Sequence, residues 1–498
     1  MTRAAIVAAA LAVTAVAAPA AGAAEWLSGD LHVHTTYSHD SYGGPADDNT
    51  GIEDFYTLGF SVAEEFALAR TRGMDFLVIS DHNDVRAQKD PGFGSMGVVG
   101  VPGYENSLKG HAQMLGATKI YDSGNESAAT VRRLADALRR DGGAFQANHP
   151  ADGERLGELN WEYAYQVLPD TVEGWNSERF YQPPAPASND HDAAVRFWEG
   201  WLDRGFKVAL TGGSDSHWRS TAAAQGVGQP TTWVYSSNRS AKAILAGLRA
   251  GRTAVSSEPP GLGGSRIYLE ADGNRDGKYD SMVGDTVPPG SPLRVRVTGA
   301  PGSLLRVVTN RGRVAAELPV TGAAFSHRLS LPRSSTWARA EVIEPDLAAQ
   351  RRAACEEQFG SDTTYCRNLL FVLAMTSSIY LRTEPDEPLR PGDPGSARMS
   401  SLRGCRKSRF RAVVTGSGIE RVTFFLDGRR RKTVRKRDSK GRFTHRIVPR
   451  KLEPGRHRVT AKARFETVTA TKSRRLSRRF TVCASARRSA RSGPRFTG

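Results

Sequence analysis

Apolar strand-like stretches alternate with amphipathic stretches from residue 26 to about residue 257, and this alternation limits the possible folds most. Residues 128–140 place apolar side chains at 131, 134, 135 and 138, which lie on one helix face; two glycines and the apolar stretch 144–147 follow. The same order of helix, glycine and strand recurs at 62–80 and 193–211. Repeated strand–helix units predict an α/β fold with mostly parallel strands in a domain covering residues 25–257.

The pattern changes after residue 257. Short alternating strands and turns in residues 258–390 predict a β-sandwich domain packed on the first. Residues 391–397 are rich in Pro and Gly and are interpreted as a linker. Strands return in residues 398–484 and predict a basic, immunoglobulin-like β domain. Residues 485–498, rich in Arg, Ser and Gly, are expected to be a disordered tail.

Residues 1–24 have the features of a secretory signal peptide. A positively charged start precedes an apolar run at 6–18, and Ala21-Gly22-Ala23 offers a cleavage site of small residues. The alternative is an uncleaved anchor, but the run is shorter than the roughly 20 residues that a spanning helix needs. No later segment is apolar enough to be a transmembrane segment. We therefore expect a secreted protein, extracellular or associated with the cell wall.

The four cysteines lie downstream of the α/β region, at 355, 366, 405 and 483. An even number in an exported chain indicates disulfides. Proximity in the sequence favours the pairs Cys355–Cys366 and Cys405–Cys483, one in each downstream region. The alternative is four free, buried thiols.

Charge is distributed unevenly. Of the 69 Lys and Arg, 32 lie from Pro391 onward, but only 6 of the 52 Asp and Glu do, so the net charge of +17 belongs to the C-terminal fifth. The run from Arg429 to Arg437 indicates an anionic partner such as a cell-wall phosphate polymer, acidic lipid or extracellular nucleic acid. A solvated basic face without a partner is the alternative. Few aromatic residues interrupt the charges, so stacking on single-stranded nucleic acid is not supported. Among these partners the anionic cell-surface polymer is the leading expectation, and nucleic acid is expected only as a possible substrate.

Eight of the eleven histidines lie between residues 32 and 217. Together with several carboxylates they fall at or just beyond strand ends, where an α/β barrel carries its functional loops. Any one of them could be an ordinary core or surface residue, but unrelated histidines would not share one rim. His39 and His191 fit this pattern less clearly than the others. The residues at strand ends are His32, His34, Asp81, His82, Glu105, His111, His149, Asp215 and His217.

The spacing of His32 and His34 has a direct structural meaning. Side chains at i and i+2 of a strand point to the same face, so both can bind one metal centre. Asp215 and His217 repeat this spacing. Histidine and carboxylate ligands without cysteine suit zinc, manganese or iron. Since the candidate ligands exceed the needs of one ion, two or three divalent ions are expected, and a pair of them could activate a water molecule.

These residues lie in motifs that occur in a known order. Asp30-Leu31-His32-Val33-His34-Thr35, Ile79-Ser80-Asp81-His82-Asn83, Pro102-Gly103-Tyr104-Glu105, Asn148-His149-Pro150 and Gly213-Ser214-Asp215-Ser216-His217 resemble the motifs of the PHP (polymerase and histidinol phosphatase) metallohydrolases. The resemblance covers roughly residues 26–257. Within the family, the expected export and Gly110-His111 make the chain most similar to the CehA/McbA-type branch. The resemblance to the family implies a distorted (β/α)7 barrel with a site for two or three metal ions.

The resemblance also implies the metal ligands, which are His32, His34, His82, Glu105, His149, Asp215 and His217. His111 and Asp40, beside His39, match less closely and are further candidates. Asp81 is expected either to bind a metal or to orient His82. His217 or His149 could transfer a proton.

The family mostly hydrolyses phosphate esters, so a phosphomonoesterase or phosphodiesterase acting on a small phosphorylated substrate is the leading expectation. Hydrolysis of carboxyl esters or carbamates is an alternative, because the branch includes such enzymes. A non-catalytic, metal-containing cell-surface binding protein is another. Three arginines after strand ends could hold an anionic substrate, or could be surface residues: Arg86, Arg179 and Arg219.

A second metal motif lies in the sandwich region. Asp272, Asn274, Asp276 and Asp280, with Gly277 between them, follow the ligand spacing of a calcium loop. The usual glutamate at position 12 is replaced by Val283. An ordinary Asn/Asp/Gly turn is the alternative.

Overall fold

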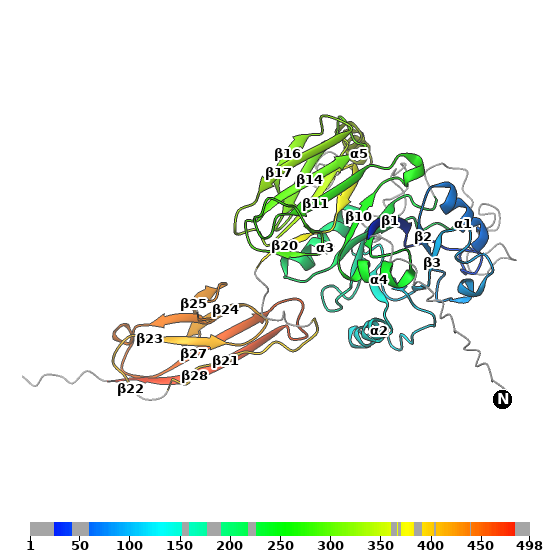
Figure 1. Cartoon of the computed structure of the whole chain (residues 1–498). Helices are drawn as coiled ribbons and strands as arrows, with labels where there is room; N and C mark the ends of the chain where they lie inside the picture. The colour runs from blue at the N-terminus through cyan, green and yellow to red at the C-terminus, as the bar shows by residue number, and fades with distance from the viewer. Residues whose placement is uncertain are drawn as a thin grey trace, which may run out of the picture.

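The computed structural model describes residues 24–41, 59–151, 159–176, 191–217, 226–359, 366, 370–382, 391–402, 405–438 and 440–483. It contains both helices and strands, with strands in the majority. Figure 1 shows a large N-terminal body and an elongated β module at the C-terminal end. The expected signal peptide, apart from Ala24, and the expected C-terminal tail lie outside the described residues. No helix among them is long and apolar enough to cross a membrane.

The N-terminal part is built on two groups of strands. In the first, parallel pairing joins β1 to β2 and β2 to β3, while β9 and β10 add to β1 in antiparallel order. The second, in the order β4-β5-β6-β7-β8, is parallel only from β6 onward. The strands are β1 (Glu25–Asp30), β2 (Phe76–Val78), β3 (Val99–Val101), β4 (Glu105–Asn106), β5 (Ala112–Leu115), β6 (Ala144–Ala147), β7 (Thr171–Asn176), β8 (Ala209–Gly213), β9 (Thr231–Ser236) and β10 (Thr253–Ser256).

The expectation of mostly parallel strands therefore holds for only part of this region. A short loop links β4 to β5, and the helix Ala241–Arg249 links β9 to β10; in both cases the second strand returns antiparallel to the first. The pairing also does not confirm a closed barrel of seven strands. The two groups of strands meet through two isolated parallel bridges, Val33 with Ser216 and His82 with Glu105. Both bridges lie among the candidate site residues.

In the described part of this region, four helices pack against these strands. Ser61 caps α1 in a capping box with Glu64, and Ser127 and Ser240 cap α2 and α4. The apolar face predicted for residues 128–140 is confirmed: Val131, Leu134, Ala135 and Leu138 of α2 are buried. The helices are α1 (Val62–Thr71), α2 (Ala128–Arg140), α3 (His191–Asp203) and α4 (Ala241–Arg249).

The sandwich region has two layers that enclose one apolar core. One layer is the four-stranded sheet β12-β11-β14-β17, and the other continues the first group of strands in the order β13-β20-β18-β19-β10, with β15 and β16 attached at β18. The strands are β11 (Arg266–Ala271), β12 (Ser281–Met282), β13 (Thr286–Val287), β14 (Pro292–Thr298), β15 (Leu304–Thr309), β16 (Arg313–Pro319), β17 (Ala324–Ser330), β18 (Trp337–Ile343), β19 (Val372–Thr376) and β20 (Ile379–Leu381).

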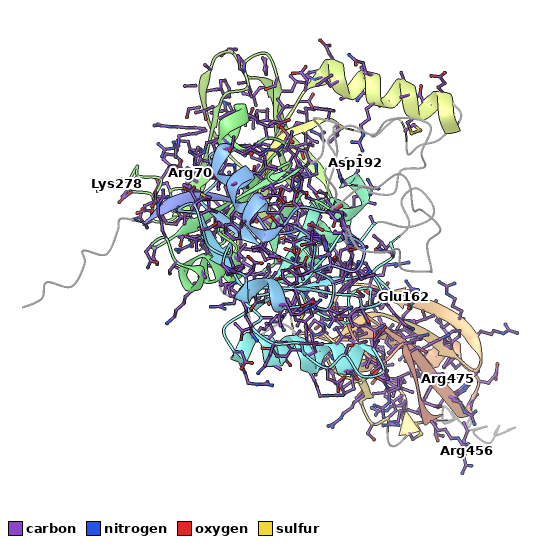
Figure 2. The ribbon with its side chains drawn as sticks, turned by 90° about the vertical axis from the view of Figure 1, so that its right-hand side faces the viewer. Arg70, Glu162, Asp192, Lys278, Arg456 and Arg475 are labelled. Carbon is purple, nitrogen blue, oxygen red and sulfur yellow. A yellow bond between two sulfur atoms is a disulfide. The ribbon has the colours of Figure 1, made fainter. Side chains whose placement is uncertain are left out.

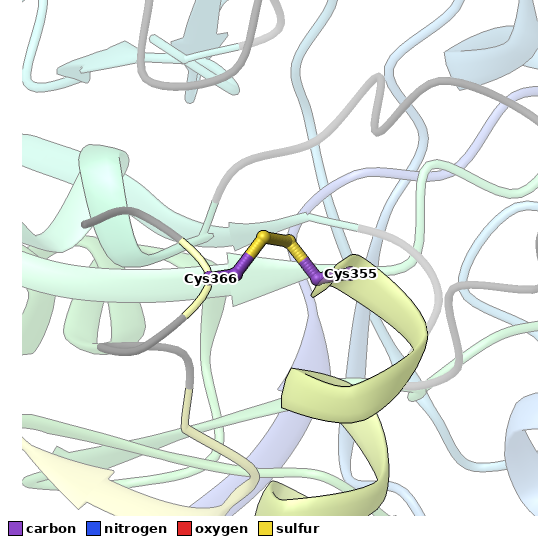
Figure 3. The surroundings of a disulfide bond; sticks show 2 residues. All are labelled: Cys355 and Cys366. Atoms are coloured by element: carbon purple, nitrogen blue, oxygen red, sulfur yellow. A yellow bond between two sulfur atoms is a disulfide. The ribbon is translucent and has the colours of Figure 1, made fainter. Parts of the chain in front are cut away.

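Two features of this region differ from the sequence-based expectation. β10 pairs with β19, so one sheet runs across the expected domain boundary at 257/258. A helix, α5 (Pro345–Phe359), stands where only strands were expected. Its alanines, arginines and glutamates favour a helix but form no clear apolar face. Its Cys355 forms the predicted disulfide with Cys366, shown in Figure 3.

The C-terminal module consists of two facing sheets, β21-β23-β26 and β22-β28-β27-β24-β25, around their own apolar core. The second predicted disulfide, Cys405–Cys483, joins its ends. The strands are β21 (Arg398–Met399), β22 (Cys405–Arg406), β23 (Phe410–Thr415), β24 (Ile419–Leu426), β25 (Arg429–Val434), β26 (Phe443–Ile447), β27 (Gly455–Phe465) and β28 (Ser473–Val482).

Candidate metal centre

The segment after β1 and the segment after β8 are joined along their backbones. His34 N donates to Ser216 O and Asp215 N donates to His32 O, each at 2.8 Å. Ser80 N donates to Val33 O, which adds the segment after β2. These bonds place the His-x-His and Asp-x-His segments side by side, although almost two hundred residues separate them in the chain.

Asp30 stabilises this arrangement of backbone segments. Its carboxylate accepts hydrogen bonds from the backbone N–H groups of His32, Ser214 and Gly228. Burial raises the pKa of Asp30 to about 6, against the lowering effect of these hydrogen bonds. Asp30 therefore contributes to the site by fixing backbone.

A first group of candidate ligands consists of His32, His34, Glu105 and Asp215, whose ligand atoms lie within 4.8 Å of one another. His32 Nε2 lies 3.0 Å from Glu105 Oε2 and 3.1 Å from Asp215 Oδ1. His34 Nε2 lies 3.3 Å and 3.1 Å from the same two oxygens. Four donor atoms thus face one small volume.

A second group consists of His34, Asp40, His82 and His217. Asp40 Oδ2 lies 3.2 Å from His82 Nε2 and 3.0 Å from His217 Nε2. The rings of His34 and His217 stack with their centroids 3.9 Å apart. His34 belongs to both groups, so the two candidate positions are adjacent.

Glu105 connects these groups to a third. Its Oε1 lies 3.2 Å from both His111 Nδ1 and His149 Nε2, while its Oε2 faces His32, His34 and His82. His82, Glu105 and His111 also form a possible metal-binding group. Glu105 is 1% exposed. One buried carboxylate therefore lies among five of the candidate histidines.

The electrostatics of the site agree with a cation-binding centre. Burial opposes ionisation of Glu105 and Asp215, yet the surrounding histidines hold the pKa of both carboxyls well below the usual value. Burial likewise lowers the pKa of His32, but Asp215, Glu105 and Glu173 raise it well above its usual value. The carboxylates thus stay ionised where they are desolvated and favour any positive charge placed between them.

The backbone of the site is also unusual. His111, His149 and Asp215 have φ values of 33°, 21° and 53°, in a region that residues other than glycine seldom adopt. Such conformations persist only where the surroundings enforce them, and they gather at functional sites. Three candidate ligands therefore share a costly backbone geometry.

Two residues that the sequence analysis did not predict form hydrogen bonds to the candidate ligands. Glu173 of β7, fully buried, accepts from His149 N and lies 3.0 Å from His32 Nδ1. Asn176 Nδ2 donates to Glu173 Oε2 and Asp215 Oδ2. Since an ionised carboxylate only accepts, the His32 proton belongs on Nδ1, which leaves Nε2 free to bind a metal. The sequence did contain a signal for Glu173, because a glutamate inside an otherwise apolar predicted strand indicates a functional role.

Asp81 lies beside the site but contacts a different neighbour from the one expected. Its carboxylate accepts from the backbone N–H and the hydroxyl of Thr35, next to His34. His82 Nδ1 instead lies 3.0 Å from Ser107 Oγ. Asp81 therefore positions the His-x-His segment, and a serine contacts the outer nitrogen of His82.

Arg86, His39 and His191 belong to none of the three groups. Arg86 has a side chain 70% exposed and pairs with Asp84. Arg179 and Arg219 lie outside the described residues. His39 stands with its ring 5.1 Å from that of His82, and His191 Nε2 donates to the backbone oxygen of Asn176.

The segment with the spacing of a calcium loop forms a compact turn in the structure. Asp272 accepts from the backbone N–H groups of Asp276 and Gly277, and Asp276 N also bonds Asn274 Oδ1. These contacts are those of an Asx-type turn. No described contact links Asp280 to the other candidate ligands.

No protein-family model matches the chain, and no curated protein matches it in sequence. Among solved structures it is similar to a two-domain protein from Bacteroides vulgatus containing a predicted PHP-like metal-dependent phosphoesterase, with 15% identity over 67% of this chain and 95% of that one, at a TM-score of 0.35. The fibronectin(III)-like modules of Clostridium thermocellum CbhA match 18% of this chain and 96% of theirs, at 17% identity and a TM-score of 0.14. Because these TM-scores are low, the function of this chain is argued from its own site residues and not from these structures.

Proposed function

We propose that the chain is a metal-dependent hydrolase that cleaves phosphoesters. The observation that carries the proposal is Glu105, which directs one carboxylate oxygen to His32, His34 and His82 and the other to His111 and His149. A carboxylate in this position can bridge neighbouring cations. Bridged metal ions are a recurrent arrangement in enzymes that cleave phosphate esters.

The donor atoms themselves fit metal ions. Two buried atoms, His34 Nε2 and Asp215 Oδ1, have no hydrogen-bond partner among the described residues, although they lie only 3.1 Å apart. Leaving such atoms unpaired is costly unless something binds them. Nitrogen and oxygen donors without sulfur favour Zn, Mn or Fe, and two or three such ions would use the three groups.

Bound ions would lower the pKa of a water molecule and neutralise the charge that develops on phosphoryl oxygens. The residues of the chain hold and orient this centre. Glu173 fixes the tautomer of His32, and Asp81 fixes the backbone beside His34. The His217 side chain is 12% exposed and donates from Nε2 to Asp40 Oδ2, so it is our candidate for proton transfer to the leaving oxygen.

The preference for phosphate esters rests on the order of the PHP-like motifs. We place the chain in the CehA/McbA-like branch on the basis of Gly110-His111 and the expected export. We propose that residues 25–257 form the hydrolase domain, a distorted barrel of seven strands, with residues 258–390 as its sandwich and residues 398–484 as a separate module. The two disulfides support export, because disulfides form in oxidising compartments.

The test combines metal analysis with three substrates. The chain, purified without chelator, is examined for bound metal and assayed on p-nitrophenyl phosphate, bis-p-nitrophenyl phosphate and p-nitrophenyl acetate. We expect two or three divalent ions per chain and turnover of a phosphate ester. Turnover of the acetate alone would instead assign a carboxyl-ester or carbamate hydrolase. A protein without metal or activity, even after metal is added, would exclude the enzyme and leave a non-catalytic binding protein as the main candidate.

A further inference from the structure

The five-stranded sheet of the C-terminal module has one apolar face and one basic face. Along β24, Val422, Phe424 and Leu426 enter the core, so Arg421, Thr423 and Phe425 face outward. Thr423 stands opposite Thr433 of β25 and Lys462 of β27. The outer face of three adjacent strands is therefore in register across the sheet.

A groove of about 320 Å³ lies on this outer face. Its lining contains four cationic side chains, Arg421, Arg430, Arg435 and Lys462, arranged around Thr423, Thr433 and Phe425. Arg430 donates to the Thr433 hydroxyl, which in turn lies 3.1 Å from the Thr423 hydroxyl. No carboxylate belongs to the groove lining. Cations and hydroxyls together form a lining suited to an oxyanion.

Most of this charge is not neutralised within the protein. Glu420 bonds Arg421 from the rim and lies 3.7 Å from Arg464. Among the described residues, Arg430, Arg435 and Lys462 have no acidic partner within ion-pair distance. The groove therefore retains a net positive charge that a ligand can use.

The basic surface extends beyond the groove. Lys462 stands opposite Arg475 of β28, and Arg458 stands opposite Arg479. Figure 2 labels Arg475 and Arg456, a further residue of the outward set on β27. Residues of one face repeat about every 7 Å along a strand, so the cations form a ladder that leads away from the groove.

We propose that this face binds a linear, base-free phosphodiester polymer, such as a polyol phosphate chain, with one phosphate held in the groove and the next ones on the ladder. The site lies on a different module from the candidate metal centre and would retain the enzyme on a polyanionic matrix. Apart from Lys462 its cations are arginines, whose planar groups pair with phosphate through two hydrogen bonds.

The surface favours such a polymer over nucleic acid and over a membrane. Binding of single-stranded nucleic acid usually uses several aromatic side chains as stacking platforms, and Phe425 is the only aromatic residue lining the groove. No large apolar side chain of the module is prominently exposed among the described residues, so nothing is available for insertion between lipids. A charged groove followed by a ladder suits a flexible charged chain.

The test measures binding of the full chain to poly(glycerol phosphate) over a range of salt concentrations. Two variants carry the same loss of charge: Arg435→Gln with Lys462→Gln in the groove, and Arg474→Gln with Arg478→Gln on the opposite face of β28. We expect the groove variant to bind at least about tenfold more weakly and its log–log salt slope to fall by roughly 1.4, about 0.7 for each lost phosphate contact. The control variant should bind like the wild type.

Several results would overturn the proposal. Equal weakening in both variants would mean that the charge acts diffusely. Absence of wild-type binding at physiological salt would exclude the polymer. Tighter binding to a thymidine 30-mer or to vesicles containing phosphatidylglycerol would assign the face to nucleic acid or lipid. Melting curves check folding, and unchanged turnover of bis-p-nitrophenyl phosphate in every variant would separate this site from the metal centre.

Discussion

At the scale of single residues, the position of Glu105 differs from that of the other candidate ligands. His34, His82 and Glu105 each belong to two of the three groups, but only the two oxygens of Glu105 together lie within 3.3 Å of five histidines. Its charge is also maintained against nearly complete burial. Removing that charge should therefore disturb several ions, whereas removing one histidine should disturb fewer.

We predict that Glu105→Gln lowers turnover of the phosphate ester by more than about 100-fold, because the amide keeps the shape but not the charge that neighbouring cations share. Metal analysis should show fewer ions per chain than in the wild type. The exposed Glu357 of α5 provides the control, since Glu357→Gln changes charge equally and lies away from the cluster. Full metal content and activity in Glu105→Gln would contradict the assignment.

Glu173 allows a second test at this scale. It touches His32 Nδ1 but not the cluster of donor atoms, so it acts as a positioning residue. We predict that Glu173→Gln weakens metal binding by about 10- to 100-fold, the range measured when the outer partner of a metal-binding histidine is lost. Calorimetric titration of the chelator-treated protein measures this directly. Unaltered metal affinity would mean that Glu173 only fills space.

At the scale of elements, α1 carries a carboxyl group that the site does not use. Glu65 is fully buried, and neither of its oxygens has a hydrogen-bond partner among the described residues. Burial raises the pKa of Glu65 well above its usual value, with a further contribution from Asp30, and Arg72 only partly opposes this. The folded protein therefore binds a proton that the unfolded chain releases near pH 4.3.

The sign of the pH effect follows from this raised pKa. Above about pH 4.3 the unfolded state gains stability by ionising, so the free energy of unfolding of the wild type should fall by up to about 1.4 kcal/mol per pH unit, until the pH reaches the folded-state pKa. Glu65→Gln should remove this decline and be the more stable protein at pH 8. Urea unfolding at pH 5 and pH 8 measures both; parallel pH profiles for the two proteins would refute the prediction.

At the scale of the whole molecule, the cores show which parts depend on one another. One sheet joins the α/β strands to the sandwich through β10 and β19, whereas the C-terminal module has its own two sheets and its own core, and Val468 is its one described residue that packs into the core of the N-terminal body. The N-terminal body should therefore unfold as one unit and the module as another. Each unit contains one disulfide.

We predict two thermal transitions that the disulfides affect separately. Cys405→Ala with Cys483→Ala opens a loop of 78 residues and should destabilise the module by about 4 kcal/mol, without changing metal content. Cys355→Ala with Cys366→Ala opens a loop of 11 residues and should cost about 3 kcal/mol in the other transition. Calorimetry distinguishes the two. A shift of both transitions by either variant would show that the units are coupled.

Local patterns in the sequence were sufficient for several features of this protein. The spacing of apolar residues predicted α2, because a helix with one buried face repeats every 3.6 residues. Proximity of cysteines predicted both disulfides. His32 and His34 were placed on one face by strand geometry alone, and the order of motifs selected the other residues that now lie around Glu105.

Only the tertiary structure decided the remaining features, because they depend on contacts between distant segments. No local pattern shows that β10 continues into β19, or that Glu173 lies behind His32. The positive φ values of His149 and Asp215 are imposed by surrounding structure. Likewise, the charge of the C-terminal region was evident from composition, but strand register determined which of its arginines share a face. The sequence alone thus specifies which groups are available, and packing determines which of them meet.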